Sequence, residues 1–289
     1  MNGTPCGGEA DLAAMRALLT RLASTAAVVD FEEQMLLASV RSRLRLWREG
    51  GDLVGFAWVD DYCNLWFETA PHAPGLAALE DEIVTWGVEC VRKLAEPGEP
   101  LSLDAVCRAD QTQRAAVLLR HGFVRQAVRT LRYARPLAQP VADCPPPPGF
   151  CIRAVTGPQE VDGLVALHRA AFDTDNMSVE ERLAMMSTPH YRPQLDLVAV
   201  APGGELAAFC VCGLEDGIGS TDPIGTHPRF QRRGLGGAVM TAGLQLLRAA
   251  GALSAELGTS SENTAMQRLA EKLGFTCVSE KVWFSKAVE

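Results

Sequence analysis

The sequence lacks the patterns that direct a protein to or across a membrane. In its 289 residues no stretch approaches the roughly 20 consecutive apolar residues of a membrane span. Its first residues, MNGTPCGGEAD, contain neither the cationic region nor the apolar region of a secretory leader. We therefore expect a soluble, cytoplasmic protein without a membrane partner.

Positive charge is also scarce. The chain has 27 Lys and Arg against 35 Asp and Glu, which gives a formal net charge of -8. Nucleic acids and anionic surfaces need a broad basic face, so we do not expect either as a main partner. Any basic patch must be local.

Paired-cysteine and metal motifs are absent from the sequence. The nine cysteines are an odd number without C-x-x-C spacing, and no histidine cluster accompanies them. Cys210 and Cys212 lie two apart in an apolar run, so they share one face of a predicted strand. We expect core packing there, and no metal site.

Length and proline content divide the chain. At about 150 residues per domain, a chain of 289 residues favours two domains. Four consecutive prolines in ARPLAQPVADCPPPPG, residues 134–149, favour polyproline II and continue neither helix nor sheet. The predicted organisation is a domain at 1–138, a semi-rigid linker at 139–149 and a second domain at 150–289.

The two halves resemble each other. GGDLVGFAWV, starting at residue 50, aligns with GGELAAFCVC, starting at residue 203, at an offset of 153. QTQRAAVLLRHGF, starting at 111, aligns with NTAMQRLAEKLGF, starting at 263, at an offset of 152. Two matches in the same order suggest a duplication, which predicts one fold present twice.

Apolar periodicity in the second half predicts an α/β or α+β domain with a mixed sheet. Gly203 and Gly204 separate two apolar runs, which is typical of a β-hairpin because paired glycines adopt the positive φ of tight turns. A stripe of apolar residues predicts a long helix that Gly251 ends. The expected strands are 150–155, 195–201, 205–214, 221–226, 252–258 and 279–286, and the expected helices are 158–172, 178–186, 235–250 and 264–273.

The run QRRGLG, from Gln231 to Gly236, lies between an extended run and the long helix. Backbone NH groups at such a turn are unpaired and bind anions. The two glycines let phosphate oxygens approach the backbone, and Arg232 and Arg233 add positive charge. The alternative is an ordinary glycine turn with solvated arginines.

The same run fits Q/R-x-x-G-x-G/A, with which the GNAT superfamily of N-acetyltransferases binds the pyrophosphate of acyl-coenzyme A. The second signature of that family, N-x-A-x-x-x-L-Y-x-x-x-G-F, resembles the segment with Asn263, Ala265, Leu269, Leu273, Gly274 and Phe275. The two motifs together cover about residues 220–275. This resemblance implies two tandem domains of the GNAT fold and acetyl-CoA as the cofactor.

The resemblance also implies which residues bind the cofactor. PIGTHP, from Pro223 to Pro228, resembles the bulged, splayed strand that precedes the phosphate loop in this family. Backbone groups freed by a bulge can pair with the amide-rich pantetheine arm, and one NH would polarise the thioester carbonyl. By analogy the cofactor-binding residues are Ile224, Gly225, Thr226, Gln231, Arg232, Arg233, Gly234, Leu235, Gly236, Gly237 and Asn263.

Attack of an amine on a thioester needs a base for the ammonium and an acid for the departing thiolate. The family's usual acid is the tyrosine of the second signature, and this chain has Ala270 in its place. Tyr191 and Ser260 are alternatives, or the thiolate leaves without help. The candidates for the base are Asp222, Glu256 and His227. Asp222 has the alternative of a capping or solvated aspartate and His227 that of a structural histidine, and the direction of Glu256 depends on the pleat of its strand.

The first half carries a degenerate copy of the motifs. HAPGLA, from His72 to Ala77, keeps G-x-A but loses every basic residue except the histidine. Pro74 removes one NH donor, Gln111 replaces the asparagine and Leu118 stands in the tyrosine place. This half is predicted to lack a cofactor site and to complete the acceptor pocket.

Three functions remain open. The first is an acetyl-CoA-dependent N-acetyltransferase that acts on an amine of a small molecule or protein. The second keeps this chemistry with another acceptor, because the size and tandem arrangement also resemble mycothiol synthase. The third is a non-catalytic acyl-CoA-binding or interaction module. An oligomer is possible, since the last predicted strand offers an edge for pairing.

Overall fold

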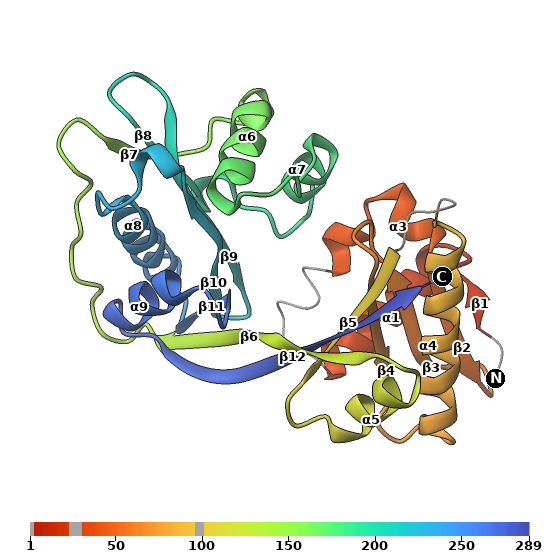
Figure 1. Cartoon of the computed structure of the whole chain (residues 1–289). Helices are drawn as coiled ribbons and strands as arrows, with labels where there is room; N and C mark the ends of the chain where they lie inside the picture. Colours follow the sequence, from red (N-terminus) through yellow and green to blue (C-terminus); the bar gives the residue numbers. More distant parts are fainter. Residues whose placement is uncertain (1–2, 23–30, 96–100, 289) are drawn as a thin grey trace. The chain divides into compact units, whose positions relative to one another are not determined.

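The computed structural model describes residues 3–22, 31–95 and 101–288, and its contacts divide the chain into two compact units (Figure 1). Unit 1 comprises Met1–Leu131, Ser260–Glu262 and Ser279–Glu289, and unit 2 comprises Arg132–Thr259 and Asn263–Val278. The chain therefore crosses from one unit to the other more than once. The division into consecutive domains on either side of a linker at 139–149 stays a prediction. The contact units differ from it, because unit 2 already begins at Arg132 and because Ser279–Glu289 belong to unit 1.

Unit 1 contains a sheet with helices packed against it. Its elements are β1 (Thr4–Pro5), α1 (Glu9–Leu22), α3 (Ala38–Ser42), β2 (Leu44–Glu49), β3 (Asp52–Val59), β4 (Asn64–Thr69), α4 (Leu76–Arg92), β5 (Leu101–Arg108) and α5 (Thr112–Arg120). The strands β2, β3 and β4 pair antiparallel, whereas β4 and β5 pair parallel at Asn64↔Asp104 and Leu65↔Ala105. Alternate residues of β4 are buried, as expected for a strand with one face on the core.

The C-terminal strand β12 (Thr276–Val288) also belongs to this sheet. It pairs antiparallel with β5 from Lys281↔Arg108 to Val288↔Leu101, and β6 (Val124–Pro136) is its other neighbour. Val282 and Phe284 are buried in the unit 1 core. The expectation of a free edge at the last strand is wrong, because strands occupy both of its sides. Only long-range pairing, which no local pattern encodes, could reveal this.

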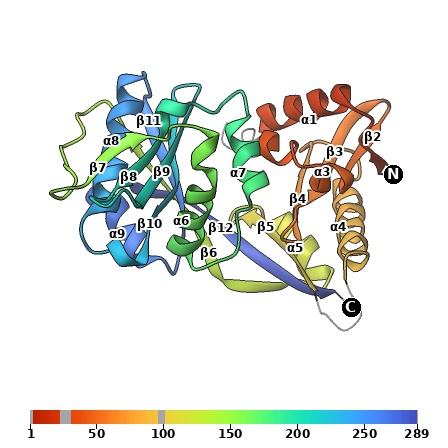
Figure 2. The same ribbon diagram turned by 90° about the horizontal axis from the view of Figure 1, so that it is seen from above.

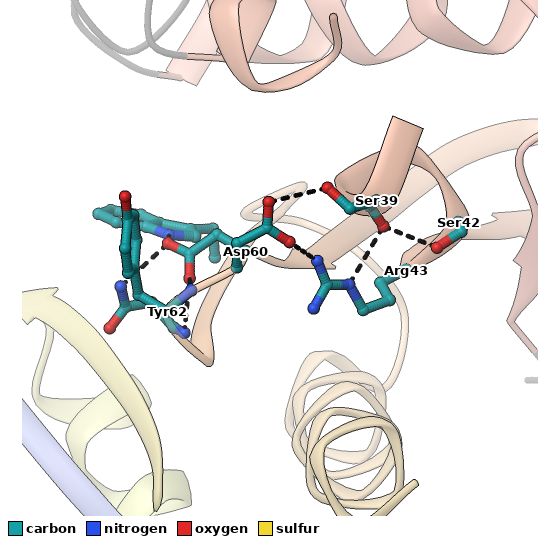
Figure 3. A network of polar contacts seen from close by, with 8 residues as sticks. Ser39, Ser42, Arg43, Asp60 and Tyr62 are labelled. Carbon is teal, nitrogen blue, oxygen red and sulfur yellow. Dashed lines mark hydrogen bonds and ion pairs between the residues drawn. The ribbon is translucent and has the colours of Figure 1, made fainter. Parts of the chain in front are cut away.

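A buried carboxylate fixes the turn between β3 and β4 (Figure 3). Asp60 is 5% exposed and accepts hydrogen bonds from the backbone NH groups of Tyr62 and Asn64, both at 2.9 Å. The indole NH of Trp66 donates to it at 2.8 Å. Since both carboxylate oxygens are used in this way, Asp60 has a structural role.

Unit 2 contains the motifs. Its elements are β7 (Cys151–Ala154), η1 (Pro158–Glu160), α6 (Val161–Phe172), α7 (Val179–Met186), η2 (Pro193–Leu195), β8 (Asp196–Val200), β9 (Leu206–Glu215), β10 (Ile218–Thr226), η3 (Pro228–Phe230), α8 (Leu235–Ala249), β11 (Ser254–Ser260) and α9 (Thr264–Lys272). Each expected strand and helix of this half has an observed counterpart. The last strand is longer than expected.

The sheet of unit 2 is mixed, as predicted. Strands β7 to β10 pair antiparallel in sequence order, and β10 pairs parallel with β11. Helix α8 covers one face and α6 the other (Figures 1 and 2). Cys210 and Cys212 are buried on one face of β9 with their sulfurs 3.5 Å apart, and Gly243 of α8 packs against them. Their predicted core position is confirmed.

The proline-rich segment is irregular, as expected, but it is held against α8. Leu137 and Val141 are buried, and the Leu137 NH donates to the Leu253 carbonyl at 2.9 Å. The side chain of Arg248 donates to the Leu137 carbonyl at 3.2 Å, and Gln245 donates to Asp143 at 2.8 Å. The start of this segment is therefore part of unit 2. Among the helices that the structure describes, none is both long and apolar enough to cross a membrane.

Candidate active site

Strand β10 is irregular where it leads into the glycine loop. Its register with β9 shifts between Thr221 and Ile224, which is a β-bulge. Its parallel pairing with β11 includes Ile218, Gly219 and Ser220, and among the described residues it ends there. Backbone groups from Ile224 onward therefore lie outside that ladder on the β11 side. The bulged and splayed strand implied by the family resemblance is confirmed.

Gly225 occupies the most crowded point of this strand. A Cβ at this residue would lie 2.6 Å from Cε1 of Phe209 and 2.8 Å from Cβ of Ala171. Ile224 and Thr226 on either side are half-buried. Only glycine permits this close approach of β10 to β9 and α6.

The loop Gln231–Gly234 is exposed and presents backbone NH groups. The Gln231 side chain donates to the Thr226 carbonyl at 3.2 Å, which ties the loop to β10. Arg232 and Gly234 have φ of 61° and 85°, so both are in the left-handed region. The first hydrogen bond of α8 runs from the Ala238 NH to the Gly234 carbonyl. The NH groups of residues 235–237 consequently have no partner within the helix.

Two arginines stand at this helix start without a counter-charge. Neither Arg232 nor Arg233 has a carboxylate partner within 4.0 Å among the described residues, and both are exposed. The neighbouring Arg229, by contrast, pairs with Glu205 at 2.8 Å. The guanidinium of Arg233 lies 5.7 Å from the ring centroid of Phe230. Unpaired NH groups and two guanidinium groups without a carboxylate partner at a helix N-terminus fit a diphosphate.

Helix α9 packs against this start of α8. Cδ2 and Cδ1 of Leu269 lie 3.6 and 3.7 Å from where a Cβ would stand at Gly236 and Gly237. Asn263 caps α9, since its Oδ1 accepts from the Met266 NH at 3.0 Å, so its amide NH₂ group remains available to a ligand. Ala270, in the tyrosine place, is 0% exposed.

The three base candidates lie in unit 2, and each is engaged elsewhere. Asp222 is exposed and accepts from the Gly258 NH at 3.2 Å. Glu256 forms an ion pair with Arg132 of β6. His227 accepts from the Arg229 NH at 3.2 Å through Nδ1 and so caps η3.

Tyr191 and Asp196 are coupled beside α7. The Tyr191 hydroxyl donates to Oδ2 of Asp196 at 2.8 Å, and Arg182 pairs with the same oxygen. Burial is the largest cause that raises the pKa of the tyrosine, and burial also raises the pKa of Asp196. Tyr191 is therefore a weaker acid than an exposed tyrosine, which disfavours it as the proton donor for the thiolate.

His168 lies outside the sequence motifs and was not among the predicted site residues. This residue of α6 is half-buried, and its ring centroid is 5.7 Å from that of Phe209, the residue that contacts Gly225. Burial, and next the charge of Arg182, lower its pKa. The sequence feature that could have indicated it is a single histidine on an otherwise apolar stripe of the predicted helix, three residues before Ala171.

Unit 1 has the same succession of strand, glycine turn and helix, but with different side chains around it. Gly75 begins α4 with φ of 65°, as Gly234 begins α8. When Pro71 is aligned with Pro228, Phe67 corresponds to Ile224. The Phe67 carbonyl, however, accepts from Nη1 of buried Arg114 at 3.2 Å. This carbonyl of β4 therefore already has a hydrogen-bond donor within unit 1.

Arg114 is part of a buried polar cluster in unit 1. Its guanidinium lies 3.4 Å from Glu80 and 3.5 Å from Glu68, and it stacks 4.2 Å from the Phe67 ring centroid. Its side chain is 8% exposed, and that of Glu80 is 6% exposed. This cluster supports the prediction that unit 1 lacks a cofactor site.

Comparison with protein families places the motif-bearing half. Residues 162–275 match the family described as Acetyltransferase (GNAT) family. A mycothiol acetyltransferase from Kineococcus radiotolerans is 32% identical over 142 residues, 47% of this chain and 46% of that protein. One from Saccharopolyspora erythraea is 32% identical over 177 residues, 58% of this chain and 56% of that protein. These alignments span about half of each relative.

Other similarities extend over more than nine tenths of the chain. A mycothiol acetyltransferase from Thermobispora bispora is 28% identical over 289 residues, 92% of each chain. The solved structure of a GNAT-type acetyltransferase from Sphaerobacter thermophilus has a TM-score of 0.74 at 20% identity, over 99% of this chain and 94% of that one. A tandem GNAT protein from the clavulanic acid biosynthesis pathway has a TM-score of 0.70 at 16% identity, over 100% and 98%.

The fold is therefore that of a tandem GNAT protein, with two α/β units in one chain. Residues 162–275 are similar to the GNAT family of acetyltransferases, and the whole chain shares its fold with a tandem GNAT protein.

Proposed function

We propose that this chain is an acetyl-CoA-dependent N-acetyltransferase whose cofactor binds to unit 2. The observation that carries the proposal is the bulged strand β10 followed by an open α8 N-terminus with two unpaired arginines. The backbone of Ile224 to Thr226 would hold the pantetheine arm, and Asn263 would contact it through its NH₂ group. Arg232, Arg233 and the NH groups of 235–237 would hold the pyrophosphate. Acetyl-CoA supplies an activated acetyl group.

The proposed acceptor is the amine of a small molecule. The relatives named mycothiol acetyltransferases make desacetyl-mycothiol the first acceptor to test. A net charge of -8 suits a cationic amine, although this supports the class of acceptor and not its identity. A cytoplasmic location stays a prediction.

The test is a reaction of the full chain with acetyl-CoA and desacetyl-mycothiol, with the acetylated product detected by mass spectrometry. A thiol reagent is unsuitable because the acceptor itself carries a thiol. A panel of aminosugars, amino acids and polyamines follows if that acceptor is inert. Product formation supports the proposal. Binding of acetyl-CoA without turnover of any amine would instead favour an acyl-CoA-binding module, which Ala270 in the tyrosine place makes the second candidate.

A further inference from the structure

His168 stands beside the bulged strand. It lies one helical turn before Ala171 and Phe172 on α6, and its ring centroid is 4.7 Å from Phe172 and 5.7 Å from Phe209. Ala171 and Phe209 are the two side chains closest to the position of a Cβ at Gly225. The imidazole is thus next to the residues that shape the backbone assigned to the thioester end of the cofactor.

The nitrogens of this imidazole are not used by the fold. Neither has a hydrogen-bond partner among the described residues, and neither is among their solvent-inaccessible polar atoms. Polar groups that serve the fold are normally paired. Asp222, Glu256 and His227, in contrast, are each engaged with another residue.

The surroundings of His168 favour its neutral form. The charged groups that face it are Arg182 and Glu181 of α7 and Arg169 of its own helix. Burial is the largest influence and lowers its pKa, Arg182 and Arg169 lower it further, and Glu181 opposes them. A neutral imidazole is free to accept a proton at neutral pH.

We propose that His168 is the base that removes the proton from the acceptor ammonium. This role rests on the proposed function. The ammonium gives one N–H proton to an imidazole nitrogen, and the freed lone pair forms the bond to the acetyl carbonyl carbon. The carbon–sulfur bond breaks, and the sulfur leaves with its electron pair and takes a proton from solvent. The nitrogen, which now carries the acetyl group, loses a second N–H proton to solvent and becomes a neutral amide. The imidazolium then returns its proton to solvent.

Two substitutions separate this role from aromatic packing. His168→Phe keeps a ring between Phe172 and Phe209 but has no nitrogen, and His168→Gln keeps polarity but is no base. We expect both to lower kcat by about 100-fold or more, which is typical of a lost general base. Acetyl-CoA affinity, measured by calorimetry, should stay within about twofold. The control is His121→Gln in unit 1, where the histidine contacts Asp81 at 2.8 Å.

The pH profile gives the second readout. In the wild type, kcat/KM should fall as the pH drops below the lowered pKa of His168, and this acid limb should be absent in both variants. Wild-type activity in His168→Phe, or an unchanged acid limb, overturns the role of His168 alone. A wild type that binds acetyl-CoA but acetylates none of the amines overturns the proposed function, and the role of His168 with it.

Discussion

Phe209 lies directly against the backbone of Gly225. A Cβ at residue 225 would stand 2.6 Å from the phenyl ring, which is closer than Cβ atoms approach other atoms in proteins. The side chain of Ala171, 2.8 Å from the same point, closes the other direction. The bulged strand can therefore hold its position between β9 and α6 only while residue 225 has no side chain.

Gly225→Ala should displace β10 from this position. We expect the free energy of unfolding to fall by about 1–3 kcal/mol, as for other overpacked cores. Acetyl-CoA affinity should fall by about tenfold or more, since the displaced backbone no longer presents its pairing groups. Urea denaturation and calorimetric titration measure the two effects. Unchanged affinity in a folded variant would show that the cofactor does not bind along this strand.

Gly236→Ala is the matched case with room for the methyl group. A Cβ there would be 3.4 Å from Oγ1 of Thr226 and 3.6 Å from Leu269, which is ordinary contact. Alanine in the first turn of α8 should raise the free energy of unfolding by about 0.5 kcal/mol. Affinity for acetyl-CoA should stay within about twofold, because the motif that resembles this loop accepts alanine at the place of Gly236. A loss of affinity as large as that of Gly225→Ala would show that the close approach at Gly225 is not what determines binding.

The unpaired arginines should determine cofactor affinity. We expect Arg232→Ala with Arg233→Ala to weaken acetyl-CoA binding by about 100-fold, since each charge-assisted contact contributes roughly 1.5 kcal/mol. The wild-type affinity should fall with added salt, and this dependence should decrease in the variant. Arg229→Ala is the control from the same turn, because Arg229 is paired with Glu205. Equal losses in both proteins would indicate only a general effect of positive charge.

The motifs were predictable from sequence because their information is local. Gly234 and Gly236 follow the arginines at fixed spacing, and Asn263 occupies the cap position before an amphipathic run. The contact of Phe209 with Gly225 depends on the register of β9 and β10, which a single sequence does not encode. The position of His168 depends in turn on how α6 packs across that pair. The local motifs therefore indicated the glycine loop but not the imidazole of His168.

The same limit applies to the candidate bases and to the last strand. Glu256 was a candidate on sequence grounds, and its partner Arg132 is 124 residues away in the chain. The pairing of β12 with β5 joins segments that are farther apart still. Charge partners and strand neighbours at such separations are set by the tertiary fold.

Low pH should lower the stability of unit 2 through the carboxylate of Glu160. Glu160 accepts from Arg153 at 2.5 and 3.0 Å and from the Thr156 NH at 2.6 Å, and the Arg153 hydrogen bond is the largest cause that lowers its pKa to about 2. Because the folded pKa is below the ordinary value of 4.5, this stabilisation is complete above pH 4.5 and is lost between 4.5 and about 2.

Glu160→Gln tests this acid dependence. It should lower the free energy of unfolding by about 1 kcal/mol at pH 7, a modest value because Arg153 is 36% exposed. The difference between wild type and variant should shrink as the pH falls through that window. Thermal denaturation of both proteins between pH 3 and 7 measures it. A difference that is constant with pH would show that the ionised carboxylate is not responsible.

The buried cluster of Arg114 and Glu80 in unit 1 leads to a prediction about stability and to one about the number of acetyl-CoA molecules bound per chain. Arg114→Met leaves the carboxylate of Glu80, 6% exposed, without its charge partner, and should cost about 3–5 kcal/mol of unfolding free energy. Arg114→Met combined with Glu80→Met should recover most of this loss, since no buried charge of that pair remains. Neither change restores arginines to the loop at His72, so the wild type and the folded double variant should each bind one equivalent of acetyl-CoA per chain. Two equivalents in the wild type would mean that Arg114 does not prevent cofactor binding along β4, and that unit 1 has kept a site.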